Sequence, residues 1–145
     1  MSNFMQSAIT LAGQAEMEIP VGAVIVKNGQ IIASACNKKE TCNDVTAHAE
    51  ILAIRAAEEK LGNWRLEDCT MYVTLEPCPM CAWAIIQSRI EAVYFGSYDK
   101  NYGALGSAMD LRKQGNSKLQ VYGGILEQEC NIILEDYFNK LRVAK

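Results

Sequence analysis

The stretch Thr74-Leu75-Glu76-Pro77-Cys78-Pro79-Met80-Cys81 carries two cysteines separated by two residues, at the junction of two apolar segments. We predict a strand over 70–75, a corner at Pro77-Cys78 and a helix that runs to about Ser88. Two thiolates at the start of a helix can bind one cation, and Zn²⁺ favours sulfur ligands at tetrahedral angles. Redox pairs and buried thiols share the C-x-x-C spacing, so the pair alone is a weak indication of a metal site.

A second motif, His48-Ala49-Glu50, begins thirty positions before the first of these cysteines. His48 is the only histidine of the chain and starts a predicted helix, so it is the natural third protein ligand. Structural zinc sites usually have four protein ligands, whereas three ligands and a water make a Lewis acid that lowers the pKa of the water toward about 7. The ligand count therefore predicts a catalytic site with one Zn²⁺ per subunit.

Glu50 supplies the group that a hydrolytic site needs. On an ideal helix, residues two apart point about 200° from each other, which argues against His48 and Glu50 both being ligands. In the first turn of a helix they can still face one pocket. A carboxylate beside the metal can take a proton from water and deliver it to a ring nitrogen and to departing ammonia. We predict Glu50 as the catalytic residue, the alternative being a solvated glutamate in an ordinary helix.

With both motifs in place, the sequence resembles the zinc-dependent nucleoside and nucleobase deaminases, whose signature is H-x-E followed by P-C-x-x-C. Within them it is similar to the bacterial tRNA-specific adenosine deaminases, which convert the wobble adenosine of an anticodon to inosine. The resemblance runs from about residue 4 to residue 142. The stretches that carry it are Asn63-Trp64-Arg65-Leu66, Tyr72-Val73-Thr74-Leu75-Glu76-Pro77-Cys78, Ser88-Arg89-Ile90 and Gly103-Ala104-Leu105-Gly106-Ser107.

This resemblance implies an activity, partners and further site residues. The implied activity is hydrolytic deamination of adenosine in a tRNA anticodon stem-loop by a homodimer, in which one subunit completes the pocket of the other. In the family, the asparagine that matches Asn37 hydrogen-bonds the target base, although a turn-forming asparagine is an equal alternative. Asn101-Tyr102 departs from the Lys-Thr of many relatives. The other substrate-binding residues implied by position are Ala49, Asp99, Tyr102, Phe138 and Arg142.

The order of the predicted elements indicates an α/β fold. We expect a helix over 3–15, strands over 20–27 and from Gln30 to Asn37 around an Asn28-Gly29 turn, and a helix over 47–61 capped by Asp44 or Thr46. Strands over 92–98 and 119–125 and a helix over 126–143 follow. The expectation is a three-layer α/β/α cytidine-deaminase-like fold, with a mixed five-stranded sheet flanked by helices, in one zinc-dependent deaminase domain over 1–145.

The composition, 50% hydrophobic and 21% charged, is typical of a globular protein. No apolar run approaches the ~20 residues of a membrane span, and no signal-like segment opens the chain, so we expect a cytoplasmic protein without a membrane partner. The cysteines are therefore expected to stay reduced. Cys36, Cys69 and Cys130 are predicted to be small buried residues, whereas Cys42, shortly before His48, remains open as an extra ligand.

The net charge of −3 and the pI of about 5.2 favour a small substrate over RNA, since phosphate contacts supply much of the affinity for nucleic acids. A local basic face would offset this. Deamination of free guanine, cytidine or deoxycytidylate is therefore the alternative function, and a catalytically silent zinc module is another, against which the intact Glu50 argues. Trp64 and Trp83 are candidates for stacking on a base, but packing in the core or a subunit interface is favoured.

Overall fold

One mixed sheet of five strands lies at the centre of the computed structural model, which describes residues 2–143. The strand order is β2-β1-β3-β4-β5. β1 is antiparallel to β2 and β3, whereas β3, β4 and β5 run parallel. The elements in chain order are α1 (Ser2–Ala12), β1 (Gly22–Lys27), β2 (Gln30–Cys36), α2 (Ala49–Leu61), β3 (Cys69–Leu75), α3 (Pro79–Gln87), β4 (Ala92–Ser97), the short 3-10 helix η1 (Leu111–Lys113), β5 (Gln120–Tyr122) and α4 (Glu127–Val143).

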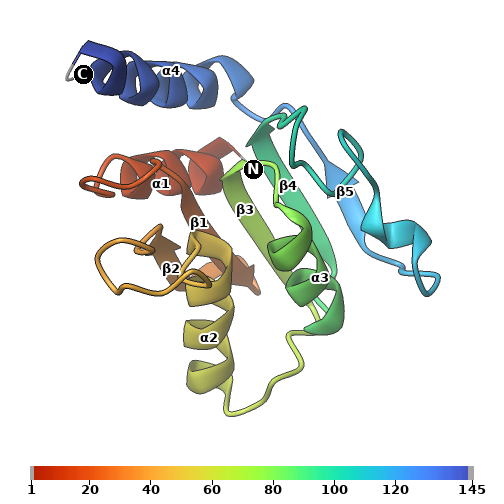
Figure 1. Cartoon of the computed structure of the whole chain (residues 1–145). Coiled ribbons are helices and arrows are strands. Elements are labelled where there is room, and N and C mark those ends of the chain that lie inside the picture. The colour runs from red at the N-terminus through yellow and green to blue at the C-terminus, as the bar shows by residue number, and fades with distance from the viewer. Residues whose placement is uncertain (1, 144–145) are drawn as a thin grey trace.

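Helices cover both faces of the sheet, which gives three layers (Figure 1). On the face of α1 and α4, Met5, Ala8 and Cys130 form a cluster of buried side chains with Val24 and Tyr72. The larger buried cluster lies on the other face and takes its side chains from α2, α3 and the central strands. Burial of these apolar side chains on both faces is the main force that holds the layers together. The predicted α/β/α fold is confirmed.

The β1–β2 hairpin has the turn that its sequence predicts. Asn28 (φ 52°) and Gly29 (φ 75°) are both in the left-handed region, as a two-residue hairpin turn requires, and Lys27 pairs with Gln30. The hairpin returns the chain to the edge at which β1 begins. There the backbone N–H of Asn37, just after β2, donates to the carbonyl of Val21, just before β1, at 3.1 Å.

Four segments meet at this edge of the sheet. β3 and β4 are parallel and end together, with Leu75 paired to Ser97, and the Glu76 N–H donates to the Ser97 carbonyl at 2.9 Å. The loops that follow these two strands therefore lie side by side. β1 begins and β2 ends at the same edge because β1 is antiparallel to both of its neighbours. In open α/β sheets, ligands bind outside the carboxyl ends of the parallel strands, so we expect the ligand site at this edge.

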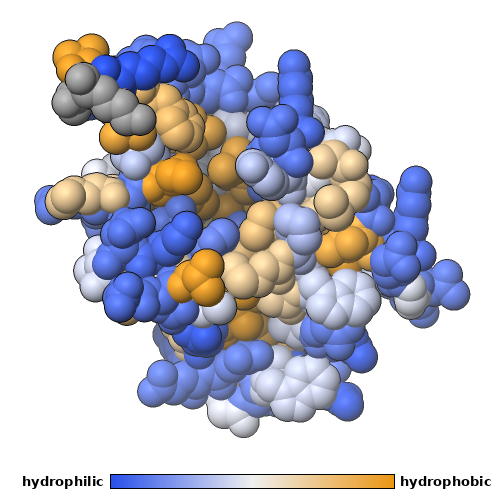
Figure 2. All heavy atoms as spheres, viewed as in Figure 1, coloured by the Kyte–Doolittle hydropathy of each residue, from blue (hydrophilic) through white to orange (hydrophobic). Residues whose placement is uncertain are grey.

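α4 packs less closely than the other helices. Of its 17 residues Cys130 is buried, while the apolar side chains of Ile132, Phe138 and Leu141 are 54%, 40% and 45% exposed. Hydrophobic side chains also gather in the recess between α1 and α4 (Figure 2). The apolar side of α4 is thus only partly covered. Within residues 2–143, none of the helices is both long enough and apolar enough to span a membrane.

Two elements end three residues earlier than predicted. β5 spans Gln120–Tyr122 rather than 119–125, because the chain turns at Gly123-Gly124, where Gly124 has a φ of 81°. α1 ends at Ala12 rather than residue 15, and turns through Gly13 and Gln14 follow it. In both places the apolar pattern continues past the point at which the backbone leaves the regular element.

Candidate functional site

His48 and Cys78 occupy equivalent positions, each as the residue that precedes the first turn of a helix. His48 is the N-cap of α2 and Cys78 is the N-cap of α3, with Pro79 next. Both have extended backbone (φ −74°, ψ 152° and φ −72°, ψ 173°), and neither side chain makes a capping hydrogen bond to its helix. Their side chains are therefore free to turn toward each other, and Cys81 joins them from the first turn of α3.

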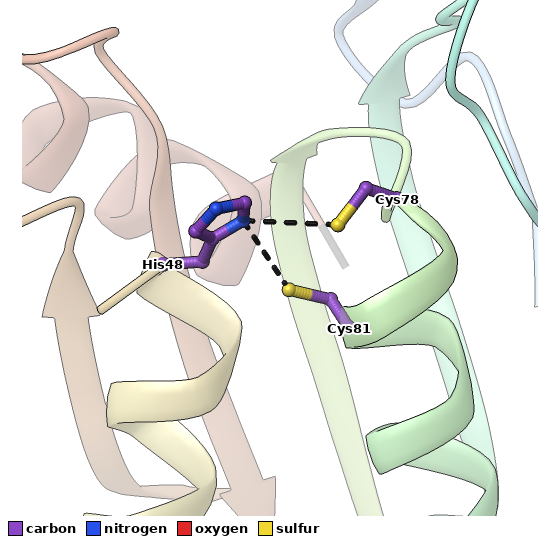
Figure 3. A group of neighbouring side chains, drawn as sticks. All are labelled: His48, Cys78 and Cys81. Carbon is purple, nitrogen blue, oxygen red and sulfur yellow. Dashed lines mark hydrogen bonds between the residues drawn. The ribbon is translucent and has the colours of Figure 1, made fainter. Parts of the chain in front are cut away.

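The three side chains converge on one point (Figure 3). The Nδ1 atom of His48 lies 3.7 Å from the Sγ atom of Cys78 and 3.5 Å from the Sγ atom of Cys81. The three potential ligand atoms all lie within 4.8 Å of one another. A tetrahedral Zn²⁺ with bonds of about 2.1 Å to nitrogen and about 2.3 Å to sulfur requires N···S separations of about 3.6 Å. The donor set and its spacing thus fit Zn²⁺.

The electrostatics of the pair of cysteines favour a thiolate. The hydrogen bond from Cys81, with that of His48, outweighs burial and lowers the pKa of Cys78 to about 4. Cys81 donates to that thiolate and is buried, and both effects raise its pKa. The hydrogen bond to Cys78 in turn raises the pKa of His48. A thiolate is the form of cysteine that binds metal, so the lowered pKa of Cys78 favours the form that a metal ligand needs.

Glu50 lies beside these residues in the first turn of α2 and is only 4% exposed. Burial is the main cause that raises its pKa to about 7. A carboxyl group with a pKa near neutrality can both accept and donate a proton at physiological pH, as a general acid and base must. A bound cation would lower this pKa by attraction and favour the carboxylate that accepts the first proton.

A cavity of about 390 Å³ opens above these groups, within the size range of small-molecule sites. A nucleobase therefore fits beside His48 and Glu50. A larger groove of about 540 Å³, which includes Trp83, lies at the opposite edge of the sheet, far from the convergent side chains. The residues that line the smaller cavity are Ile19, Val21, Asn37, Lys39, His48, Glu50, Leu75, Glu76, Cys78, Asp99 and Tyr102.

Asn37 performs a structural task that the sequence pattern did not indicate. Its Oδ1 atom accepts from the N–H of Ala49 at 2.7 Å, and its Nδ2 atom donates to the carbonyl of Ile19 at 2.9 Å. Asn37 therefore satisfies a free N–H group at the start of α2. The predicted cap at Asp44 or Thr46 is wrong: Asp44 instead accepts from the N–H and hydroxyl of Thr46 in a local turn. Asn37 also lines the cavity.

The other predicted substrate residues lie in three different environments. Asp99 and Tyr102 line the cavity, and the Asp99 side chain accepts from the N–H groups of Asn101 and Tyr102, both at 3.1 Å, which fixes their turn. Ala49 is fully buried beneath the site. Phe138 and Arg142 lie exposed on α4, outside the lining of the cavity.

The remaining cysteines lie apart from the convergent group. Cys36, Cys69 and Cys130 are buried, as predicted. Cys42 is exposed, and among residues 2–143 the metal-binding group at this site comprises His48, Cys78 and Cys81 without it. Sequence reasoning gave no role to Glu18 and Glu76, because nothing in the local pattern shows that they reach the cavity or its walls.

Comparison with known proteins agrees with this geometry. The model of the cytidine and deoxycytidylate deaminase zinc-binding region matches residues 1–97, which include both ligand-bearing motifs. The tRNA-specific adenosine deaminase of Bacillus subtilis is 48% identical over 98% of this chain and 91% of its own length.

Two solved structures show how far the similarity extends. One, from a study of A-to-I editing by tRNA:A34 deaminases at the wobble position, is 43% identical with a TM-score of 0.87 and covers 92% of this chain and 100% of that chain. The guanine deaminase of Bacillus subtilis is 47% identical with a TM-score of 0.64, but the match covers 66% of this chain and 63% of that chain. The likeness to the first structure therefore includes elements that the likeness to the second leaves out.

Proposed function

The chain belongs to the zinc-dependent cytidine and deoxycytidylate deaminase family, and from this premise we propose that it hydrolyses adenosine to inosine at the wobble position of a tRNA anticodon. The observation that carries the proposal is similarity over nearly the whole chain to relatives named for this reaction. The convergent His48, Cys78 and Cys81 beside Glu50 supply the chemistry that such a reaction needs.

His48, Cys78 and Cys81 would hold Zn²⁺, which as a Lewis acid lowers the pKa of a water and makes it nucleophilic at neutral pH. Glu50 takes a proton from the attacking water while the water oxygen bonds C6 of adenine. Glu50 delivers this proton to the ring nitrogen N1, then takes the second proton of the attacking water from the hydroxyl now on C6 and passes it to the exocyclic amine as the C6=O bond forms. The C6–N bond breaks, ammonia leaves and inosine remains. The burial of Glu50 suits this shuttle because it keeps the pKa of the carboxyl near neutrality.

The cavity walls hold the base in place for this step. We assign Asn37 to the base edge, through the amide hydrogen that Ile19 does not use. Tyr102 is 67% exposed at the rim, where its ring can stack on a base. The adenosine must leave its stack to enter a cavity of about 390 Å³, which a single-stranded anticodon loop allows at lower cost than a duplex.

We further propose that the protein binds the anticodon stem-loop of the tRNA and that its active form is a homodimer. Trp64 and Trp83 are 51% and 40% exposed, and large apolar side chains of this kind suit a subunit interface better than solvent. Light scattering of the purified protein measures the oligomeric state directly. A mass of one chain at micromolar concentration would contradict the dimer.

Deamination of free guanine is the second candidate, because the guanine deaminase of Bacillus subtilis is 47% identical over the part that matches. The discriminating experiment presents zinc-loaded protein with an anticodon stem-loop carrying wobble adenosine, and separately with free adenosine, cytidine and guanine, each product being identified by mass. Inosine in the stem-loop with no turnover of free bases or nucleosides supports the proposal. Turnover of free guanine alone would contradict it.

A further inference from the structure

The cavity has two walls, and each is attached to a buried carboxylate. The first wall contains Asn37 and Lys39, and the second wall belongs to the loop over residues 99–107, of which Asp99 and Tyr102 line the cavity. Glu18, 3% exposed, accepts hydrogen bonds from the chain just beyond the first wall, at residues 40 and 41. Glu76, 2% exposed, accepts hydrogen bonds from the second wall.

Glu76 uses both of its carboxylate oxygens to hold the second wall. Oε1 accepts from the N–H of Asp99 at 3.1 Å and from the hydroxyl of Ser107. Oε2 accepts from the N–H of Leu105 at 3.2 Å and from the N–H of Ser107 at 3.1 Å. The donors come from the first residue, the middle and the last residue of the loop. One side chain therefore fixes the whole course of the second wall.

The loop lies so close to this carboxylate that it needs a glycine. A Cβ atom on Gly103 would lie 2.4 Å from Cδ and 2.5 Å from Oε1 of Glu76. The next N–H, of Ala104, donates to the carbonyl of Pro77 at 2.9 Å, which holds the loop against the segment that leads to Cys78. Gly103 is thus a second, independent indication that the loop is built around Glu76.

Glu76 lines the same cavity as His48 and Glu50, but its hydrogen bonds go to the loop. A buried carboxylate is costly unless every oxygen is paired, so four hydrogen bonds to one loop indicate that the group is there for the loop. Its side chain accepts from residues of the loop, whereas His48 and Glu50 are held at the start of α2. Loss of the hydrogen bonds to Glu76 would release Asp99 and Tyr102 from their positions without moving His48 or Glu50.

We propose that Glu76 is a positioning residue that fixes the second wall against the substrate and thereby sets substrate affinity. The inference rests on the proposed function, since affinity here means affinity for the base that enters the cavity and for the nucleotides beside it. Glu76 acts through Asp99 and Tyr102. Its replacement is expected to raise KM while kcat and zinc content stay close to the values of the unaltered protein.

Two variants test this by different routes. Glu76→Gln keeps the shape of the side chain, but its amide has one acceptor oxygen. The N–H of Asp99 loses its acceptor in one orientation, and the N–H groups of Leu105 and Ser107 lose theirs in the other. Gly103→Ala displaces the loop and leaves the carboxylate intact. Glu59→Gln makes the same chemical change at an exposed position on α2 and is the matched control. Glu18→Gln makes this change at another buried glutamate, whose hydrogen bonds go to residues 40 and 41 and not to the loop, so it tests whether the effect is specific to Glu76.

Amide hydrogen exchange and steady-state kinetics are the two readouts. We expect exchange at Asp99, Leu105 and Ser107 to rise by about tenfold or more in Glu76→Gln and Gly103→Ala, and not in the two controls. KM for the substrate that the unaltered protein turns over is expected to rise about tenfold in both loop variants, with kcat within about threefold and one zinc retained.

Three results would overturn the inference. They are unchanged exchange at residues 99–107, a uniform rise of exchange across the sheet as from general destabilisation, and a fall in kcat with unchanged KM. Exchange needs no substrate, so it decides whether Glu76 holds the loop even if the stem-loop is not turned over. Failure of the unaltered protein to form inosine in the stem-loop would contradict the proposed function alone.

Discussion

The Nδ1 atom of His48 lies 3.7 Å from the Sγ atom of Cys78, although thirty residues separate them in the chain. The relationship depends on two helix starts that face each other across the carboxyl edge of the sheet, each with an extended N-cap residue whose side chain is not used for capping. The fold thus brings a nitrogen and a sulfur ligand to the separation that a tetrahedral zinc ion needs.

Removal of one thiol should remove the metal. We expect Cys81→Ser to lose bound zinc, because a neutral hydroxyl replaces the thiolate ligand that the ion induces. Cys42→Ser, at an exposed cysteine outside the group, is the matched control and should keep one zinc per chain. Metal analysis of the purified variants measures both. Equal zinc in the two variants would exclude Cys81 as a ligand.

Glu50 is expected to be needed for turnover and dispensable for metal binding. Glu50→Gln preserves the shape but cannot accept a proton, so turnover should fall by about 100-fold or more. Zinc content should equal that of the unaltered protein, because the ligand atoms belong to His48, Cys78 and Cys81. Single-turnover assays at saturating substrate together with metal analysis check this. Full activity of the variant would remove Glu50 from the role of proton shuttle.

Asn37 should contribute to stability through the start of α2. Asn37→Ala removes the acceptor for the N–H of Ala49, and loss of such a helix cap lowers the free energy of unfolding by about 1 kcal/mol. Asn139→Ala, at an exposed position on α4, is the control and should change stability by less than half that amount. Denaturant unfolding of the two variants, both loaded with zinc, gives the comparison. Equal stabilities would show that water replaces the Asn37 side chain without cost.

Glu18 should make stability depend on pH in the acidic range. Burial raises its pKa, but hydrogen bonds from Thr41 and Glu40 outweigh burial, and the net pKa lies below its ordinary value of 4.5. For a group with a lowered pKa in the folded state, the stabilisation is complete above the ordinary pKa and is lost as the pH falls through the folded value.

The measurable quantity is the difference in unfolding free energy between the unaltered protein and Glu18→Gln, both freed of metal. We expect a constant difference above about pH 5.5 that shrinks as the pH falls below 4.5. Removal of metal from both proteins keeps the titration of the zinc ligands out of the comparison. A difference that stays constant down to pH 3 would contradict the inferred shift.

The parts of the fold with a local signal could be predicted from the sequence. Asn28-Gly29 specifies a hairpin turn by itself, and the alternation of strands and helices specifies the three layers. The zinc prediction depended on histidine and cysteine, whose side chains bind few kinds of metal ion. The match to a zinc-binding family and the convergence of the three side chains confirm it. The roles of the individual ligands and of Glu50 stay predictions until the variants are measured.

The features that sequence reasoning missed all depend on partners distant in the chain. The cap of α2 was placed at Asp44 or Thr46, because caps are normally the residues just before a helix, whereas Asn37 reaches it from twelve positions earlier. Glu76 was quoted as part of a motif and given no role, since the loop that it holds begins 23 residues later. The role of a buried carboxylate can be assigned only when the residues that donate hydrogen bonds to it are known.

Deamination in water labelled with ¹⁸O tests the central claim most directly. The zinc-loaded protein is incubated with an anticodon stem-loop carrying adenosine at the wobble position and at a second position in the stem, and the RNA is analysed by mass after digestion. Hydrolysis by water at the wobble base predicts one ¹⁸O atom at C6 of a single inosine, with the stem adenosine unchanged and Glu50→Gln inactive. Absence of inosine, or inosine without the label, would contradict the account.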